Sequence, residues 1–224
     1  MRRVVFVLWA GCGFAPAAPS DAGELAADAP GVCSKLVATG GTPAATLGGN
    51  GGTARPDLTC AAGELPIGIS VTTTQQPRPE GGAGGERVVT AFDVLCGTVI
   101  QMNGGSLVTA TAEPTGWTAN ACAGWGPYVP TPVVHCPDNT ILVGLTANGG
   151  PTTLFNTVSL TCALVNGDST LGPLVTQPVA DSGSYSNHME MAKCPAGQVV
   201  IAFKDRGDCG VDGIAPVCAP LQCR

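Results

Sequence analysis

The sequence repeats one short pattern three times, and this repetition constrains the fold more than any other feature. The three copies are "TCAAGELPIGI" at 59–69, "HCPDNTILVGL" at 135–145 and "KCPAGQVVIAF" at 193–203. In each copy a cysteine is followed eight positions later by Gly68, Gly144 or Ala202, and then at once by a large apolar residue. A unit of this size cannot bury its apolar face alone, so repeats of this kind pack against one another around a shared core.

Each copy also has a closing cysteine, and the repeats therefore predict three disulfides. They are Cys60–Cys96, Cys136–Cys162 and Cys194–Cys218. Apolar residues stand four and two positions before each closing cysteine: Phe92 and Val94, Val158 and Leu160, Ile214 and Pro216. Alternation with a period of two is typical of a strand with one buried face. Each repeat is predicted to be an antiparallel strand pair, with a bulge or a close backbone approach at the eighth-position glycine.

Helix is not expected in this chain. Its 32 glycines and 19 prolines interrupt almost every window of helical length, and β-branched residues dominate between them. Three antiparallel sheets around a pseudo-threefold axis form a β-prism, so we predict an all-β, disulfide-stapled β-prism. The predicted single domain spans 32–224, with repeat cores at 58–96, 134–162 and 192–218.

The first residues predict export. Two arginines after Met1 supply a positive end, "VVFVLWA" is an apolar stretch too short to span a bilayer, and "APAAP" offers small residues for cleavage. We therefore predict a signal peptide at 1–17 and a flexible tether at 18–31. The alternative is a lipoprotein signal that ends before Cys12 in "WAGC", which would leave a lipid anchor at the cell envelope. Trp9 fits that pattern poorly, so free secretion is favoured.

The cysteine count agrees with an oxidising compartment. Of 11 cysteines, ten remain once Cys12 is removed or lipidated, which is an even number suited to disulfides. Elimination predicts the pairs Cys209–Cys223 and Cys33–Cys122 for the last four, although four cysteines allow three pairings.

Composition argues against several classes of partner. Charged residues make up only 12% of the chain and the net charge is −6. Nucleic acids and anionic membrane surfaces need clustered Lys and Arg, which this chain lacks. No segment after the signal approaches the roughly 20 apolar residues of a membrane helix. Neither a metal nor a cofactor is expected, because the chain has no C-x-x-C pair and only two histidines, His135 and His188.

The middle repeat resembles the vitelline membrane outer layer protein family. The resemblance rests on "WGPY" at 125–128, "HCPDNTILVGL" at 135–145 and "TLFNTVSLTC" at 153–162. The family's ending, T-A-L-N-x-I-x-L-x-C, is matched at Thr153, Asn156, Val158, Leu160 and Cys162. Asn139 stands where the family has a turn glycine. The resemblance implies a β-prism of three Greek-key sheets in a surface-coating protein similar to jacalin-type lectins, with no catalytic residues to carry over.

Three aromatic residues, Trp117, Trp125 and Tyr128, flank Cys122 in a glycine-rich stretch. Aromatic faces stack on sugar rings, and a tryptophan on a loop is a common way for lectins to hold sugar, so Trp117 is a predicted ligand-binding residue. The alternative is that these rings fill the core. We favour this alternative for Trp125 and Tyr128, because of their place in the motif.

The segment "DRGDCGVD" at 205–212 has the densest charge in the chain. Asp205, Asp208 and Asp212 are predicted ligand-binding residues, since carboxylates on a flexible loop also suit a hard cation such as calcium. Their spacing fits no known calcium loop, so a solvated turn is favoured and no metal is predicted. Residues 206–208 also spell Arg-Gly-Asp, the tripeptide that integrins read, but a three-residue match arises easily by chance.

Binding is favoured over catalysis. General acid–base chemistry needs a base beside a nucleophile or a pair of carboxylates, and neither histidine has such a partner at a telling spacing. The glutamates at 64, 80, 86 and 113 are scattered in loops. We therefore expect an exported, non-enzymatic module that binds a glycan or a cell-surface component, or coats the cell envelope, through loops at the ends of the prism. The alternative is a secreted hydrolase or transferase that acts on glycans.

Overall fold

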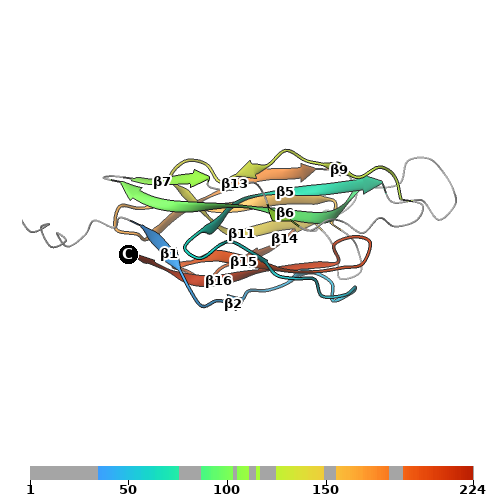
Figure 1. The fold of residues 1–224 in the computed structure, drawn as a ribbon, viewed down its shortest axis with the longest axis horizontal. Coiled ribbons are helices and arrows are strands. Elements are labelled where there is room, and N and C mark those ends of the chain that lie inside the picture. The colour runs from blue at the N-terminus through green and yellow to red at the C-terminus, as the bar shows by residue number, and fades with distance from the viewer. Residues whose placement is uncertain are drawn as a thin grey trace, which may run out of the picture. The chain divides into compact units, whose positions relative to one another are not determined.

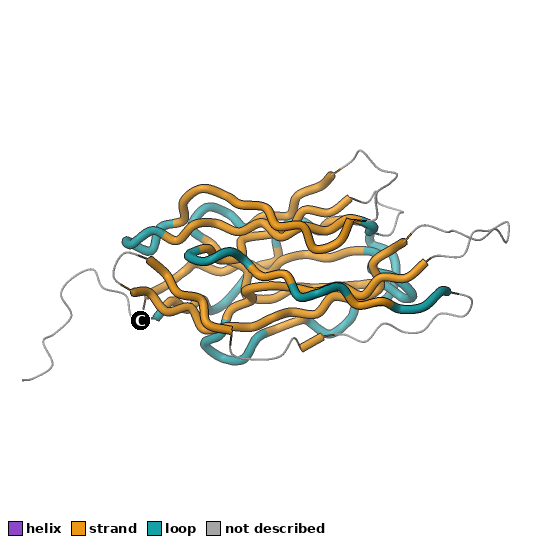
Figure 2. Tube along the Cα trace, turned by 90° about the horizontal axis from the view of Figure 1, so that it is seen from above, coloured by secondary structure: helices purple, strands orange, loops and turns teal. Residues whose placement is uncertain are grey.

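In a computed structural model, the described part of the protein consists of strands, turns and loops. This structure describes residues 35–75, 87–102, 105–110, 115–116, 125–148, 155–181 and 189–223, which all belong to the unit Val32–Arg224. These residues contain no helix, which confirms the predicted all-β class (Figure 2). The predicted signal peptide at 1–17 and tether at 18–31 lie outside the described residues and stay predictions.

Three long antiparallel hairpins form the centre of the fold, one from each repeat (Figure 1). They are β5–β6 (Leu65–Gln75 and Arg87–Met102), β11–β12 (Thr140–Asn148 and Thr157–Val165) and β15–β16 (Gln198–Arg206 and Gly213–Cys223). In every hairpin the first strand follows the opening cysteine and the second strand contains the closing cysteine. The predicted antiparallel strand pair is therefore confirmed in all three repeats.

Shorter strands widen each hairpin into a sheet. The first sheet adds β7 (Gly105–Ala110), β8 (Thr115–Gly116), β9 (Val129–Pro130) and β10 (Val134–His135). The second adds β13 (Leu171–Asp181) and β14 (Met189–Lys193), and the third adds β2 (Thr42–Pro43), β3 (Leu47–Gly48) and β4 (Leu58–Thr59). Strand β1 (Leu36–Ala38) pairs with both β6 and β16, so the first and third sheets are continuous.

The short strand before each opening cysteine joins the sheet of a different repeat. Strand β10 of the second repeat pairs with β5 of the first, β14 of the third pairs with β11 of the second, and β4 of the first pairs with β15 of the third. These three exchanges close a ring. The repeated sequence therefore encodes both a hairpin and the strand that attaches this hairpin to its neighbour, which explains why one short pattern is needed three times.

The eighth-position glycine lies where these strands cross. A Cβ at Gly68 would be 2.6 Å from the carbonyl oxygen of Val134 and 2.9 Å from Cα of His135. A Cβ at Gly144 would be 2.9 Å from Cα of Lys193 and closer still to the carbonyl oxygen of Ala192. The pairing register also shifts at this point in all three hairpins. Both predicted features, a bulge and a close backbone approach, are confirmed.

Two apolar clusters fill the space between the hairpins. The larger one takes buried side chains from every repeat, including Phe92, Leu145 and Phe203. The smaller one collects residues five and seven positions after the opening cysteines, such as Ile67 and Val143. The predicted buried face is confirmed before the closing cysteines, because the residue four positions before each of them belongs to the larger cluster. Next to the opening cysteines, both faces of the strand are buried. There the bulge changes the direction of successive side chains, and a separate cluster buries each face.

The three disulfides predicted from the repeats are present: Cys60–Cys96, Cys136–Cys162 and Cys194–Cys218. Cys209 is disulfide-bonded as well. The backbone argues against its predicted pairing with Cys223, because Cys209 precedes the 11-residue strand β16 and Cys223 is the last residue of that strand. At about 3.3 Å per residue the strand spans about 30 Å, whereas bridged Cα atoms lie within about 7 Å. The predicted partners Cys33 and Cys122 lie outside the described residues.

The hairpins have two different ends. At the turn end, a tight turn follows each opening cysteine, at 61–64, 137–140 and 195–198. The third residue of each turn has a positive φ, which is 83° at Gly63, 63° at Asn139 and 75° at Gly197. Asparagine is the residue type that best replaces glycine in this conformation, so Asn139 preserves the turn.

At the loop end, backbone hydrogen bonds connect the three hairpins. The backbone N–H of Val89 donates to the carbonyl oxygen of Phe155 at 2.7 Å, and the carbonyl oxygen of Val89 accepts from the N–H of Val211 at 3.1 Å. Each of these residues comes from a different repeat. Backbone hydrogen bonds therefore link the three hairpins close to the points where their loops begin.

Candidate functional site

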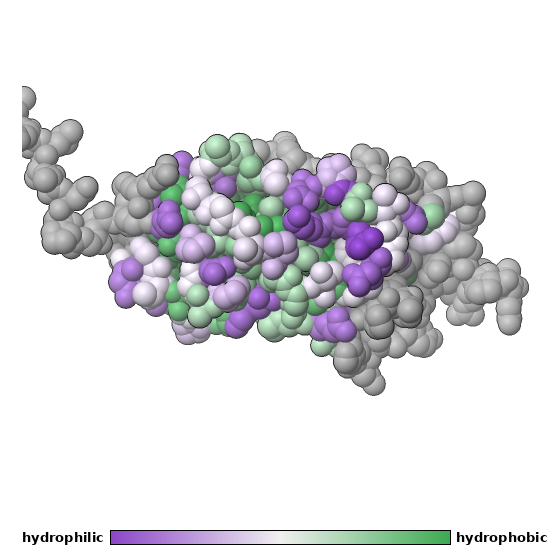
Figure 3. Space-filling model, turned by 90° about the horizontal axis from the view of Figure 1, so that it is seen from below, coloured by the Kyte–Doolittle hydropathy of each residue, from purple (hydrophilic) through white to green (hydrophobic). Residues whose placement is uncertain are grey.

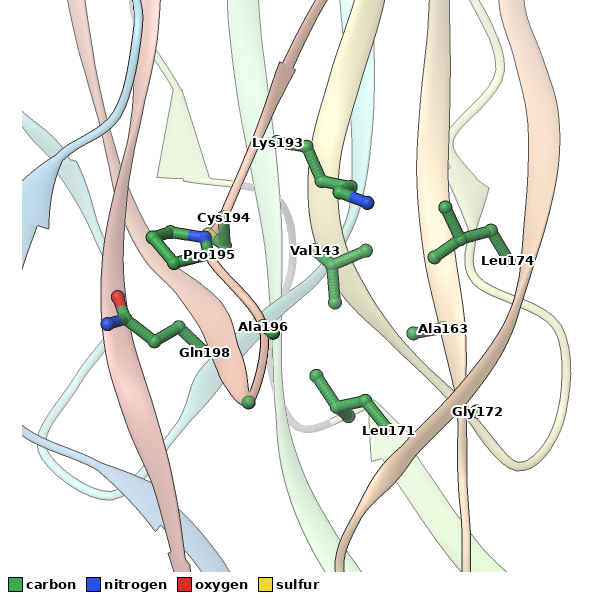
Figure 4. Close-up of a pocket in the computed structure, with 11 residues that line it drawn as sticks. Val143, Ala163, Leu171, Gly172, Leu174, Lys193, Cys194, Pro195, Ala196 and Gln198 are labelled. Carbon is green, nitrogen blue, oxygen red and sulfur yellow. The ribbon is translucent and has the colours of Figure 1, made fainter.

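A groove of about 210 Å³ lies at the turn end, between β13 and the 195–198 turn (Figure 4). Apolar side chains line it on the side of the second sheet: Val143, Ala163, Leu171 and Leu174. The opposite side is formed by the turn and by the neighbouring Cys194, which is locked in its disulfide. Sites for drug-sized ligands measure roughly 300–1,000 Å³, so this groove suits one smaller chemical group.

Lys193 supplies the charge at this groove. Strand β14 places Lys193 opposite Gly144, and its side chain extends over Val143 with the amino group directed toward Leu174 (Figure 4). The side chain is exposed, and it has no hydrogen bond or ion pair in the part of the chain that the structure describes. An ammonium group without a counterion is therefore available to a ligand.

The turn adds donors from the backbone. The N–H groups of Ala196 and Gly197 donate to no other group, as far as the described residues extend, and both residues are exposed. Successive N–H groups in a turn with one left-handed residue form a small concavity that binds anions. Gln198 completes this side of the groove. Its Oε1 is buried without a partner, and its amide is turned away from Lys193 and Leu174 (Figure 4).

Strand β13 forms the outer edge of the second sheet beside the groove. Leu174 and Val175 are exposed there by 46% and 38%, which would invite an added strand. Two prolines, Pro173 and Pro178, remove backbone donors from the same strand. The edge is therefore protected against strand addition, while the groove beside it stays open to a small group.

The equivalent positions of the other two repeats carry different chemistry. The residue before the opening cysteine is Thr59 in the first repeat and His135 in the second, where the third has Lys193. In the first repeat, Nζ of Lys35 lies 3.0 Å from the position of a Cβ on Gly63, so a side chain covers that turn. The same position at Gly197 has nothing within 4 Å. Among the three turns, an adjacent cation and an open backbone occur together at the third.

The loop end has a different organisation, centred on the buried Arg55. Its guanidinium pairs with the carboxylate of Asp205 at 3.3 Å, and both side chains are almost fully buried. It also donates to the carbonyl oxygens of Gly207 at 3.0 Å and Gly210 at 2.9 Å. Arg55 therefore fixes the loop of the β15–β16 hairpin from within. This role could not be predicted from sequence, because a single arginine in "TARPD" follows no recognisable pattern.

The three predicted acidic residues do lie in one loop, but their contacts are internal. Asp205 pairs with Arg55, and Asp208 accepts hydrogen bonds from the backbone N–H and the hydroxyl of Thr53 at 3.1 and 2.9 Å. Burial raises the pKa of Asp205, against the opposing effect of Arg55. Burial and the nearby carboxylate of Asp208 raise the pKa of Asp212. Ligand binding by these residues stays a prediction, and no cluster suited to a metal ion occurs among the described residues.

The Arg-Gly-Asp tripeptide is tied into the same loop. The side chain of Arg206 donates to the carbonyl oxygens of Gly51 at 2.9 Å and Gly52 at 3.0 Å, and Asp208 is held by Thr53. On the face of the molecule that Figure 3 shows, hydrophilic residues gather toward the end where the β15–β16 loop lies. The charged groups of the tripeptide are thus used within the fold.

The aromatic residues of the "WGPY" segment are not in the core. Trp125 and Tyr128 are half-buried and belong to neither apolar cluster, so the expectation that they fill the core is wrong. The reason is that this segment runs along the edge of β5, where the hydroxyl of Thr74 donates to the carbonyl oxygen of Gly126 at 2.8 Å. Trp117 lies outside the described residues, so its predicted role is untested.

The described residues give no support to catalysis. The groove is lined by no carboxylate and no histidine, and its cysteine is oxidised. Burial raises the pKa of Asp93, whose carboxylate accepts a hydrogen bond from the hydroxyl of Ser70 at 3.4 Å outside the groove. Nδ1 of His135 lies 3.0 Å from the carbonyl oxygen of Cys136. Glu64 is the one member of the four scattered glutamates within the described residues.

No family model and no curated protein matches the chain. Solved structures similar to it include a Malaysian banana lectin (15% identity, TM-score 0.44, covering 81% of this chain and 99% of the lectin). Others are a mannose-specific jacalin-related lectin from Morus nigra (15%, 0.44, 81% and 96%) and the Calystegia sepium agglutinin (12%, 0.48, 84% and 100%). These scores stay below 0.5, so no conclusion about function follows from them. None of the comparisons identifies the vitelline membrane outer layer family.

Proposed function

We propose that this protein is an exported, non-enzymatic module that binds carbohydrate or coats the cell envelope. The observation that carries the proposal is the groove at the turn end. It combines an ammonium group that is unpaired within the described residues, two free backbone donors and an apolar floor, and its lining includes no carboxylate, no histidine and no reduced cysteine. Such a set of groups suits binding without turnover.

Export is supported by the covalent structure. Disulfides persist in oxidising compartments; each repeat contains one, and Cys209 is disulfide-bonded as well. No helix in these residues is long and apolar enough to cross a membrane. Free secretion after cleavage of 1–17 is proposed, with lipidation at Cys12 as the alternative. The β-prism and the motif at 125–162 support kinship with the vitelline membrane outer layer proteins.

The loops at the loop end are proposed as a second contact surface. Two of the three hairpin loops, 76–86 and 149–154, lie outside the described residues, and the third is braced by Arg55. A rigid scaffold that presents variable loops is a common arrangement for recognition. Half-buried Trp125 stands beside this end and offers an aromatic surface to a sugar.

The direct test is a glycan array and a polysaccharide pull-down with the oxidised protein, together with a turnover assay on every glycan that is bound. The proposal predicts binding to a subset of glycans and no release of product. Binding to no glycan would contradict the carbohydrate-binding part of the proposal, and turnover of a bound glycan would favour the hydrolase or transferase alternative. A matched variant, Lys204→Met, controls for non-specific effects of charge, because Lys204 is exposed and lies outside the groove.

A further inference from the structure

The groove at the turn end can be assigned to a particular kind of sugar. We propose that it binds an acidic, N-acetylated sugar residue, with the carboxylate at Lys193 and the 195–198 turn and the acetyl methyl group on the apolar floor. This inference rests on the proposed carbohydrate-binding function. It names the ligand class and the residues that select it.

The carboxylate follows from the charge and the donors at the groove. Lys193 carries the one charge among the lining residues, and its ammonium group is unpaired within the described residues. The free N–H groups of Ala196 and Gly197 lie three and four positions further along the same segment. A carboxylate is a planar acceptor with two oxygens, so it can receive a charge-assisted bond from the ammonium group and further bonds from the backbone.

An acidic residue three positions before Leu171, Asp168, does not compete with a ligand for Lys193. Asp168 lies in the turn that leads into β13, and its carboxylate accepts hydrogen bonds from the backbone N–H of Thr170 at 3.0 Å and from its hydroxyl at 2.6 Å. These bonds lower the pKa of Asp168 and hold its charge within its own turn. Lys193 is therefore left without a partner from this side of the groove.

The acetyl group follows from the floor. Aliphatic side chains make up the floor, and no aromatic ring is present on which the flat face of a sugar could stack. A methyl group fits among Val143, Ala163 and Leu174 better than a ring does. The volume of about 210 Å³ also limits the groove to one small substituent and its neighbouring charge.

A β-strand is a poor occupant for the same groove. Pro173 lies in the edge strand between Gly172 and Leu174, which both line the groove, so it interrupts the row of donors that strand addition requires. The groove therefore selects a small ligand, and a peptide ligand would have to bind without extending the second sheet.

The test compares three sugars by calorimetry or nuclear magnetic resonance titration of the oxidised protein. N-acetylneuraminic acid has both groups, glucuronic acid has the carboxylate alone, and N-acetylglucosamine has the acetyl group alone. We expect the first to bind at least tenfold more tightly than either of the others. Equal affinity for N-acetylglucosamine would overturn the role of the charge, and equal affinity for glucuronic acid would overturn the role of the floor.

Variants then locate the site. Lys193→Met keeps the apolar stem and removes the charge, so it should weaken N-acetylneuraminic acid at least tenfold, whereas Lys193→Arg should retain most of the affinity and Lys204→Met should retain all of it. Leu174→Ser should weaken binding several-fold without affecting folding, because Leu174 is 46% exposed. If the protein binds glycans but none of the groove variants matters, this inference fails and the proposed function survives. If no glycan binds at all, the proposed function itself fails.

Discussion

The turn end and the loop end of the three hairpins are built in opposite ways. At the turn end, each repeat supplies the same tight turn and the same crossing strand, and the repeats differ by single side chains such as Lys193. At the loop end, the loops differ in length and sequence, and a residue from outside the repeats, Arg55, holds the one that is described. The residues that the repeats share thus determine the fold, and the residues in which the repeats differ, such as Lys193, give each turn its own chemistry.

The largest effect is expected at the loop end, on removal of Arg55. Arg55→Met would leave the carboxylate of Asp205 buried without its cation and would remove donors from the carbonyls of Gly207 and Gly210. Loss of one partner of a buried ion pair costs about 3–5 kcal/mol, so we expect a decrease of that size in the free energy of unfolding. Urea denaturation measures it.

A matched control is available on the same hairpin. Lys204 pairs with Asp57 at 3.8 Å, and both side chains are about half exposed. Lys204→Met should therefore lower the free energy of unfolding by less than about 1 kcal/mol. Similar losses for the two variants would mean that Arg55 does not hold the loop end.

The second effect is expected at the turn end, at the strand crossings. A Cβ at Gly144 would meet the backbone of the crossing strand β14, so Gly144→Ala should lower the free energy of unfolding by about 1–3 kcal/mol. The third crossing already accommodates Ala202, which is buried and paired with Thr59. Gly167→Ala is the control, because its Cβ would have nothing within 4 Å, and we expect a change within about 0.5 kcal/mol. If Gly144→Ala left the free energy of unfolding unchanged, the backbone of β14 would have room for a Cβ at the crossing, which would contradict the close approach.

The crossings show what could be predicted from sequence. The spacing of cysteine, glycine and alternating apolar residues was enough for the hairpins, three disulfides and the all-β class. The exchange of strands between repeats could not be predicted, because strands of two or five residues such as β10 and β14 leave no periodic signal. The backbone of β16 argues against the predicted Cys209–Cys223 pairing, because elimination ignores distance along an extended strand.

The smallest effects concern pH and have opposite signs at the two ends. Burial and Asp208 raise the pKa of Asp212 at the loop end, so its charge opposes folding above its ordinary pKa of 3.8. Asp212→Asn should therefore stabilise the protein slightly at pH 7, and the gain should disappear in acid once Asp212 is protonated in the parent protein.

Asp168 near the turn end should behave in the reverse way. Hydrogen bonds from Thr170 lower its pKa, so its stabilising contribution is present above 3.8 and is lost as the pH falls through the lowered value. Asp168→Asn should destabilise the protein slightly at pH 7 and have little effect below that value. Urea denaturation of both variants at neutral and acidic pH tests the pair, and shifts of the same sign would contradict it.

The candidate site was harder to predict than the fold. The sequence shows Lys193 as the residue before a repeat cysteine. Its place in the groove could not be predicted, because the groove also needs an exposed turn and strand β13, which belongs to no repeat core. Asp205 and Asp208 were predicted ligand-binding residues because of their charge, but in the fold they bind Arg55 and Thr53. Charge density in a sequence does not distinguish a group that is paired internally from one that is free.

The most direct test of the account is a nuclear magnetic resonance titration of the oxidised protein with N-acetylneuraminic acid, read as amide shift changes along the chain. Binding at the turn end predicts shifts at the amides of Lys193, Ala196 and Gly197 and on β13 near Leu174, and none of these shifts in Lys193→Met. Shifts confined to the β15–β16 loop or to the segment around Trp125 would contradict the account, because they would place recognition at the loop end.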